Sequence, residues 1–334
     1  MAEVLFLEHK ILDGMATQVA KFAKKLKGKR VAVKAHFGEH GNLFYLRPVF
    51  LSTVVAELNK AGARPFAFDS PVAYAGGRFT AQDYISTARQ NGFTSEAIGC
   101  PIVISDEGVT VETPIGEFDA SKPLMDTDGM IVLSHFKGHS LATFGGAIKN
   151  LGMGGFTKAS KTKLHSVTGA RIANLRACTG CGSCVDVCPF GFLEVKSGKI
   201  SMKRCLGCCA CVIACPNHVF ENKSVPLGAG LAEVIKPLID SFSKGMILYI
   251  NVLLDIVDKC DCVAQGLGED DLPVVCPNLG ILISEDIVAV DQASLDLVNK
   301  ESNGKFAKLF GADQSQQTAT GEKIGLGSRK YDLV

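Results

Sequence analysis

Eight cysteines in two equally spaced runs are the residues of this 334-residue chain that indicate chemistry most directly. The runs span residues 178–189 and 205–216, and each reads C-x2-C-x2-C-x3-C-P. A cubic [4Fe–4S] cluster needs a thiolate at each of its four corners, and this spacing is typical of chains that supply them. Cysteines three residues apart on one loop reach three corners, and the proline after the fourth cysteine turns the chain away. The sequence therefore predicts two [4Fe–4S] clusters.

The two runs together resemble a bacterial-type two-cluster ferredoxin domain, in which the fourth cysteine of each run binds the other cluster. This resemblance implies two sets of four ligands. The first cluster would be held by Cys178, Cys181, Cys184 and Cys215. The second cluster would be held by Cys205, Cys208, Cys211 and Cys188. A short hairpin predicted between the runs, with its turn at Ser197-Gly198, would bring the two loops together.

Disulfide bonds and zinc are the alternatives for these cysteines. Disulfide frameworks suit short secreted domains, whereas this chain is long and begins without the basic and apolar segments of a secretory signal. Zinc usually takes paired C-x2-C ligands separated by a longer gap, so the third and fourth cysteines of each run exceed its needs. The spacing favours iron–sulfur clusters over both.

A second group of candidate residues consists of histidines in two similar settings. The segments V-K-A-H-F-G-E-H and V-L-S-H-F-K-G-H each follow a predicted strand and end at residues 40 and 139. Because ligands of open α/β sheets bind beyond the carboxyl ends of strands, the four histidines are expected to share one crevice. Imidazoles there could transfer protons, bind an anion or hold a metal. The alternative is that they are loop histidines, solvated or hydrogen-bonded to backbone.

A glycine-rich run over residues 144–155 follows the second histidine pair. Exposed backbone N–H groups beside its lysine could bind a phosphate or carboxylate, although the run matches no nucleotide-binding motif. Tight turns with solvated lysines are the alternative. The residues expected to act in catalysis are His36, His135 and Lys149. Those expected to bind a small-molecule or anionic ligand are His40, His139, Asn150 and Gly152.

The remaining cysteines form no pattern of comparable strength. They are Cys100, Cys209, Cys260, Cys262 and Cys276. Free cysteine is usually a small buried apolar residue, which is the interpretation favoured here over a further metal site or redox pair. Asp286 precedes an apolar helical pattern and is expected to cap that helix.

Strands and helices alternate on both sides of the cysteine runs. Predicted strands cover residues 4–7, 30–36, 64–69, 102–104, 109–111, 129–134, 246–257 and 280–283. Predicted helices cover residues 11–26, 50–58, 81–91, 231–242 and 287–298. This alternation predicts an α/β fold with a layered, mostly parallel sheet. The runs would form a small inserted ferredoxin-like α+β domain over residues 171–223, between α/β segments 1–170 and 224–334.

Composition restricts the class of protein. The net charge of +1 gives no general attraction to nucleic acid or anionic membranes. The longest apolar run is too short to span a bilayer and contains Asn251 and Asp255. Thirteen cysteines, mostly cluster ligands, imply a reducing, oxygen-poor environment, so a cytoplasmic location is expected.

The chain also resembles the DUF362 family, an uncharacterised group of α/β proteins that often carry a ferredoxin insert. The resemblance rests on His139-Ser140 through Gly146-Ala-Ile-Lys-Asn-Leu-Gly152 and on Asp286-Ile-Val-Ala-Val-Asp291, where Ile287 replaces a common proline. It implies the fold and the insert, and it names no substrate.

These features lead to one main hypothesis and two rivals. The main hypothesis is an iron–sulfur redox protein, with oxidoreductase as the candidate enzyme class, that passes electrons through two clusters to or from a site on the α/β body. The first rival is a non-catalytic electron carrier that docks a redox partner or assists assembly of its metal centre. The second is a hydrolase or transferase with structural clusters, which no nucleophile–base motif supports.

Overall fold

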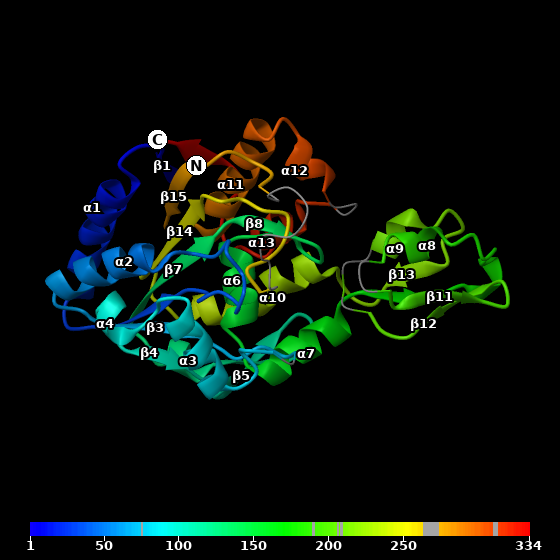
Figure 1. Ribbon diagram of the computed structural model, residues 1–334, viewed down its shortest axis with the longest axis horizontal. Coiled ribbons are helices and arrows are strands. Elements are labelled where there is room, and N and C mark those ends of the chain that lie inside the picture. The colour runs from blue at the N-terminus through cyan, green and yellow to red at the C-terminus, as the bar shows by residue number, and fades with distance from the viewer. Residues whose placement is uncertain (75, 189–190, 206, 208–209, 263–273, 310–312) are drawn as a thin grey trace.

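The computed structural model contains an eight-stranded sheet covered by helices on both faces (Figure 1). It describes residues 1–74, 76–188, 191–205, 207, 210–262, 274–309 and 313–334. In sheet order the strands are β16 (Tyr331–Leu333), β1 (Ala2–Leu7), β15 (Gly280–Ser284), β14 (Ile247–Leu253), β7 (Gly129–His135), β2 (Arg30–Lys34), β3 (Arg64–Asp69) and β4 (Ile102–Ile104). The run from β14 to β4 is parallel, and β15 is antiparallel to both its neighbours. The predicted α/β fold with a mostly parallel sheet is confirmed.

Successive residues of a strand point to opposite faces of the sheet, so alternate residues pack into two separate hydrophobic cores. Val31 and Val33 of β2 pack with one core, whereas Ala32 packs with the other. The first face is covered by α1 (Ile11–Ala23), α2 (Pro48–Lys60) and α3 (Ala81–Gln90). The second face is covered by α6 (Ala147–Gly154), α10 (Leu227–Asp240) and α11 (Ile287–Glu301). Because both faces are covered, most residues of the central strands are apolar.

Several helix boundaries follow local chemistry. Thr80 and Asp83 form a capping box at the start of α3. The Asp286 carboxylate accepts backbone N–H groups of Val288 and Ala289, so its predicted capping role for α11 is confirmed. Shorter helices complete the body: η1 (Lys24–Leu26), α4 (Ser95–Ile98), α5 (Lys122–Met125), α7 (Lys158–Val167), α12 (Lys305–Lys308) and α13 (Gln316–Lys323).

The glycine-rich run forms regular secondary structure, which neither the anion-binding loop nor the tight turns considered for it describe. It forms the second strand of a hairpin, β8 (Lys137–His139) with β9 (Thr143–Gly145), and then the helix α6. The lysines after it lie on α7. Glycine normally disfavours a helix interior, but here buried neighbours approach its Cα atoms closely. A further hairpin joins β5 (Gly108–Thr113) to β6 (Gly116–Ser121).

Residues 170–222 project from the body as a small lobe (Figure 1). Its elements are β10 (Ala170–Ile172), η2 (Leu175–Ala177), α8 (Ser183–Asp186), β11 (Leu193–Lys196), β12 (Lys199–Met202), α9 (Ala210–Ala214) and β13 (Phe220–Asn222). β10 and β13 pair antiparallel, so the chain leaves and re-enters the body side by side. The predicted hairpin turn at Ser197-Gly198 is confirmed, since both residues have positive φ between β11 and β12.

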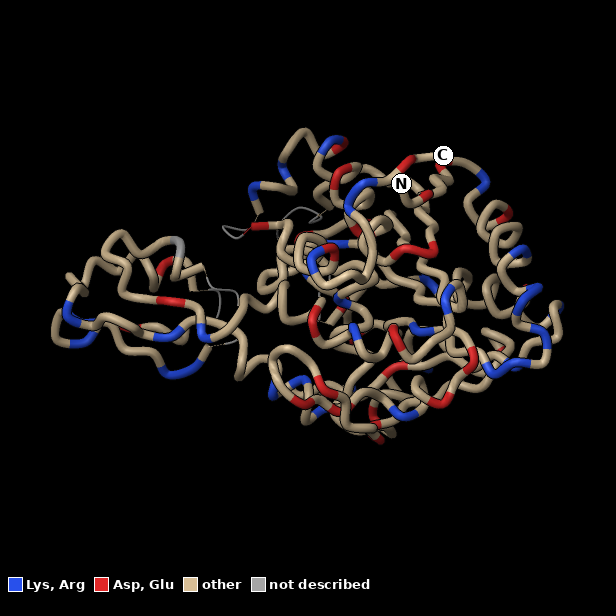
Figure 2. Tube along the Cα trace, turned by 180° about the vertical axis from the view of Figure 1, so that it is seen from behind, with Lys and Arg blue, Asp and Glu red and all other residues tan. Residues whose placement is uncertain are grey.

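Charge is distributed without a dominant sign. Figure 2 shows basic and acidic residues interspersed along the trace of the body, which agrees with the small net charge. Among the described residues, no helix combines the length and apolar character needed to cross a membrane.

Candidate functional site

A pocket lies at the carboxyl ends of β2, β3 and β7, where the parallel strands predict a ligand site. Charged and sulfur-bearing residues from distant segments converge there. Those lining it are Lys34, His36, Asp69, His135, Lys137, Lys149, Asn150, Cys260 and Asp261. The expected crevice therefore exists, and it gathers His36, His135, Lys149 and Asn150 from the predicted site residues.

A buried ion pair forms one wall. Lys34 Nζ lies 3.1 Å from Asp69 Oδ1 and donates a 2.5 Å hydrogen bond to Asn150 Oδ1. Tyr84 donates a 2.5 Å hydrogen bond to the other Asp69 oxygen. Burial raises the pKa of Asp69, but Lys34, together with Lys161 and the Tyr84 hydrogen bond, outweighs that effect and leaves the pKa below its usual value. Asp69 is therefore a fixed anion.

The His36 imidazole faces a guanidinium. Arg78 Nη1 lies 2.6 Å from His36 Nε2, and Arg78 Nε donates a 2.8 Å hydrogen bond to Glu39. Burial, assisted by the Arg78 charge, lowers the pKa of His36 to about 3. His36 is therefore a neutral imidazole at physiological pH, and N–H donors face both ring nitrogens: Arg78 at Nε2 and the Gly38 amide, 3.0 Å away, at Nδ1.

His135 anchors a loop instead of facing an open space. Its Nδ1 lies 2.9 Å from Asp261 Oδ1, and its Nε2 lies 2.7 Å from the Leu254 carbonyl. Both partners are hydrogen-bond acceptors, so the ring is held between two oxygen atoms. Lys137 Nζ donates to the second Asp261 oxygen at 2.8 Å. Burial alone would raise the pKa of Asp261, yet His135 and Lys137 hold it well below its usual range.

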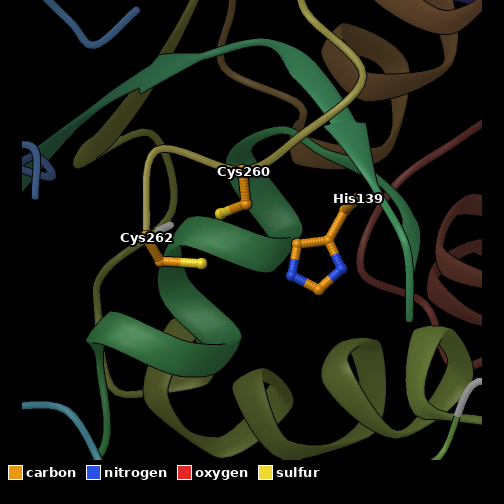
Figure 3. Close-up of side chains that lie close together, drawn as sticks. All are labelled: His139, Cys260 and Cys262. Atoms are coloured by element: carbon orange, nitrogen blue, oxygen red, sulfur yellow. The ribbon is translucent and has the colours of Figure 1, made fainter. Parts of the chain in front are cut away.

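The ammonium group of Lys149 contacts a sulfur atom. Its Nζ lies 3.0 Å from Cys260 Sγ, and the thiolate raises the pKa of Lys149 although burial acts against the charged form. Figure 3 shows Cys260, Cys262 and His139 pointing toward one another, and their ligand-type atoms all lie within 4.8 Å of each other. A hydrogen bond from the Cys262 thiol and the Lys149 charge hold the pKa of Cys260 well below its usual range, although burial opposes this.

These three side chains are of types that can bind a soft metal ion. The hydrogen bonds of His139 argue against that use. Its Nδ1 accepts the backbone N–H groups of Leu141 and Ala142 at 3.2 and 3.1 Å. The proton of the neutral ring must therefore lie on Nε2, the nitrogen that faces the sulfur atoms in Figure 3. A metal ligand would need that nitrogen unprotonated.

The amino end of α6 is not an open anion site. The N–H groups of Ala147 and Ile148 donate to the two oxygens of buried Asp291, at 2.7 and 2.9 Å. A Cβ atom on Gly146 would lie 2.3 Å from Asp291 Oδ1, and one on Gly154 would lie 2.3 Å from Lys34 Nζ. The absence of side chains at Gly146 and Gly154 therefore leaves room for the buried side chains of Asp291 and Lys34.

Two of the expected ligand-binding residues, Gly152 and His40, lie away from the pocket. A third, His139, contacts the cysteine pair beside the pocket. Gly152 packs against α10, where an added Cβ atom would lie 2.8 Å from Leu231 Cδ2. His40 is exposed and does not line the pocket. His139 does not line the pocket either, but it contacts Cys260 beside it.

In the projecting lobe, four cysteines surround a second cavity. Three come from the first cysteine run and one from the second: Cys178, Cys181, Cys184 and Cys215. These are the four residues that the ferredoxin resemblance assigns to the first cluster. Of the residues assigned to the second cluster, Cys188, Cys205 and Cys211 pack on or in the lobe core. Cys208 lies outside the described residues.

Backbone N–H groups point at several of these sulfur atoms. Ile200 N lies 3.3 Å from Cys178 Sγ, Val219 N lies 3.4 Å from Cys215 Sγ, and Ala170 N lies 3.3 Å from Cys205 Sγ. A Cβ atom on Gly169 would lie 2.7 Å from Cys205 Sγ. The loops therefore direct donors toward sulfur and leave no room for side chains beside it.

A larger hollow of about 1060 Å³ lies at the opposite, amino-terminal edge of the parallel strands. Residues such as Lys25, Lys244 and Glu285 line it. No cysteine or histidine is among its lining residues, and ligands of such sheets bind at the other edge. Chemistry therefore favours the smaller pocket despite its size.

Sequence reasoning missed several residues of the pocket. Lys34 and Asp69 end the buried strands β2 and β3, and a charged residue at a buried strand end is a signal that could have identified them. Arg78 lies in a loop without such a signal. Asp261 is flanked by cysteines, but only folding brings it to His135.

Comparisons with known proteins show the family of the chain and a solved structure to which it is similar. A family model described as "Domain of unknown function (DUF362)" matches residues 31–296. No curated protein matches the chain. Among solved structures, the chain is similar to the lactate racemase apoprotein from Thermoanaerobacterium thermosaccharolyticum, with a TM-score of 0.45 and 11% identity. The match covers 90% of this chain and 58% of that chain.

Proposed function

The chain belongs to the DUF362 family, and from the two sites described above we propose that it is an iron–sulfur redox protein. The lobe would hold two [4Fe–4S] clusters and pass electrons to or from the pocket on the α/β body. When bound, such clusters supply one-electron transfer with little rearrangement of the protein.

The observation that carries this proposal is the composition of the lobe cavity. Cys215 follows Cys184 by 31 positions, yet both line the same small cavity with Cys178 and Cys181. A disulfide would need only two of these cysteines, whereas a cubic cluster takes four. The grouping also agrees with the exchange of fourth ligands that a two-cluster ferredoxin domain requires.

The surroundings of the sulfur atoms support the same proposal. Cys178, Cys184, Cys211 and Cys215 are all at least nine-tenths buried within the lobe core. Burial and backbone N–H groups directed at sulfur are the features by which a protein stabilises a cluster and sets its potential. The fit of the described residues to such a cluster is therefore chemical as well as positional.

Packing links the lobe to the pocket. A Cβ atom on Gly207, beside the second cysteine run, would lie 3.2 Å from Leu227 Cβ at the start of α10. The same helix packs on α6 through Leu231 and Gly152, and α6 carries Lys149 into the pocket. The helices α10 and α6 therefore connect the second cysteine run to the pocket through direct packing contacts.

The buried charges of the pocket favour a protein that acts there over a pure electron carrier. Taking charged groups out of water costs several kcal/mol each unless they are paired, so folds rarely assemble them without use. A redox partner would meet the projecting lobe, which stands clear of the body in Figure 1.

Metal analysis tests the cluster assignment. Protein purified without air should contain about eight iron and about eight sulfide atoms per chain, as two four-iron clusters require. The Cys184→Ser variant should lose about half of both. Cys100→Ser is the matched control, because Cys100 is a buried cysteine of the body and should leave the iron content unchanged.

Three outcomes would contradict the proposal. One is zinc in place of iron. Another is disulfide bonds among the lobe cysteines of air-free protein. The third is four or fewer iron atoms in the unsubstituted chain.

A further inference from the structure

Cys260 and Cys262 lie side by side in the body, outside the two cysteine runs. Cys260 is 4% exposed, and Cys262 is partly exposed. Two trans peptide units span at most about 7.6 Å, so a modest bend at Asp261 suffices to give residues 260 and 262 the Cα spacing of roughly 4.4–6.8 Å that a disulfide needs. Their sulfur atoms lie within 4.8 Å, so a side-chain rotation would bring them into bonding distance.

The protein holds this segment in place from both sides. Asp261, between the two cysteines, is fixed by His135 and Lys137 as described above. The Cys262 carbonyl accepts hydrogen bonds from Tyr74 Oη at 2.9 Å and from Arg78 Nη2 at 3.3 Å. Buried His135, Lys137 and Arg78, together with the exposed Tyr74, thus hold this three-residue segment from two stretches of the chain. That is more support than two core cysteines need.

Cys260 is surrounded by groups that stabilise a thiolate. The Lys149 ammonium lies 3.0 Å from its sulfur, and His139 presents the protonated Nε2 because its Nδ1 is occupied by two backbone donors. A nearby ammonium and a ring N–H both favour a negative sulfur and both oppose a metal cation in the same space. The surroundings therefore suit a nucleophilic sulfur better than a metal ligand.

We propose that Cys260 and Cys262 form a reversible dithiol–disulfide couple, a redox centre of the body distinct from the clusters of the lobe. In the oxidation, the Cys260 thiolate and the Cys262 thiol form one S–S bond and release two electrons and one proton. The proton leaves from Cys262, the more exposed sulfur. In the reduction, two electrons and one proton return and the S–S bond breaks.

This inference rests on the proposed function for the identity of its electron partner. Two [4Fe–4S] clusters each accept one electron, so together they match the two electrons of a single disulfide. Exchange with thiols in solution would be slow, because the thiolate sulfur is buried and the accessible sulfur is a protonated thiol. The clusters are therefore the expected partner.

Thiol trapping tests the couple in the intact protein. Holo-protein is kept overnight without air in mixtures of reduced and oxidised dithiothreitol, so that even slow exchange reaches equilibrium, and is then denatured, alkylated, digested and analysed by mass spectrometry. The peptide containing residues 260–262 should change between a doubly alkylated form and a form two hydrogen masses lighter with no label. The Cys262→Ser variant should stay singly alkylated at Cys260 in every mixture. Cys276→Ser, a buried cysteine outside the pair, should behave like the unsubstituted chain.

A second measurement tests the role of Lys149. Iodoacetamide labelling of Cys260 at neutral pH should be at least tenfold slower in Lys149→Met, since the thiolate loses its nearest cation. Lys158→Met, the same substitution at a lysine on α7, should leave the labelling rate of Cys260 unchanged. Equal rates in both variants would overturn the thiolate assignment.

Other outcomes are separable from failure of the clusters. Doubly alkylated cysteines in every mixture would refute the couple, even with eight iron atoms present. Zinc or another ion bound in equal amount to the chain, lost in Cys262→Ser while the iron content stays intact, would show a metal site instead. Iron absent from the lobe while the disulfide forms would refute the proposed electron partner and leave the couple standing.

Discussion

Asp291 is a buried carboxyl group whose described hydrogen-bond partners are neutral. It accepts from two backbone N–H groups of α6 and from Asn251 Nδ2 at 2.8 Å. Burial raises its pKa to about 6 against these donors. Its proton is therefore bound more tightly in the folded than in the unfolded chain, so the folded state loses stability as this group ionises.

The pH dependence of stability should reveal this group. Between about pH 4 and about pH 7, the free energy of unfolding of the unsubstituted chain should fall relative to Asp291→Asn, by up to about 3 kcal/mol. The variant carries a side chain that cannot titrate, and the comparison cancels all other titrating groups. Urea unfolding of both proteins across this pH range measures the difference. A difference that is constant or increases with pH would contradict the raised pKa.

At the scale of elements, α6 has two tasks that depend on glycine. It must lie close to α10, and it must carry Lys149 and Asn150 into the pocket. The close approach at Gly152 serves the first task, because any side chain there meets Leu231. Displacing the helix would therefore alter stability and site together.

Gly152→Ala tests this packing. The added methyl group would lie 2.8 Å from Leu231 Cδ2 and 3.0 Å from the Leu231 carbonyl oxygen. We expect the free energy of unfolding to fall by about 1–3 kcal/mol, reduced by the roughly 1 kcal/mol that alanine gains over glycine in a helix. Denaturant unfolding measures the change. In a Leu231→Ala background the same substitution should cost less, and an equal cost in both backgrounds would refute the steric explanation.

At the scale of the whole molecule, the lobe has a core of its own. Its buried residues form a cluster separate from the two cores of the body. The paired strands β10 and β13 form its connection, with Ile172 opposite Phe220. Such a connection resembles an insertion whose two ends meet, which predicts that the body does not need the lobe in order to fold.

Excision tests that independence. Replacing residues 173–219 by Asn-Gly would close β10 and β13 with a two-residue hairpin turn. The shortened chain should remain folded, with the body's far-ultraviolet circular dichroism and a cooperative unfolding transition, and it should contain no iron. An insoluble or unfolded product would show that the lobe stabilises the body. The unsubstituted chain treated with an iron chelator is the matched control.

Much of the fold followed from local patterns. Apolar strand and helix periods predicted most elements of the sheet and its covering helices, and Ser197-Gly198 identified a hairpin turn. The structure of the glycine-rich run could not be predicted, because its glycines make room for Asp291, Leu231 and Lys34, which are distant in sequence. The same cause hid the sulfur site: Cys260 gains its chemistry from Lys149 and His139, more than a hundred residues away.

The cysteine spacing by itself determined the prediction of clusters, because ligands on one loop are placed by a few neighbouring residues. The alternating apolar pattern likewise determined an α/β sheet, since burial of strand faces is decided residue by residue. Only the tertiary structure decided which imidazoles donate and which accept, and which sulfur lies beside an ammonium group. Those properties depend on charges and donors that long-range packing brings within about 3 Å, and no local spacing encodes such encounters.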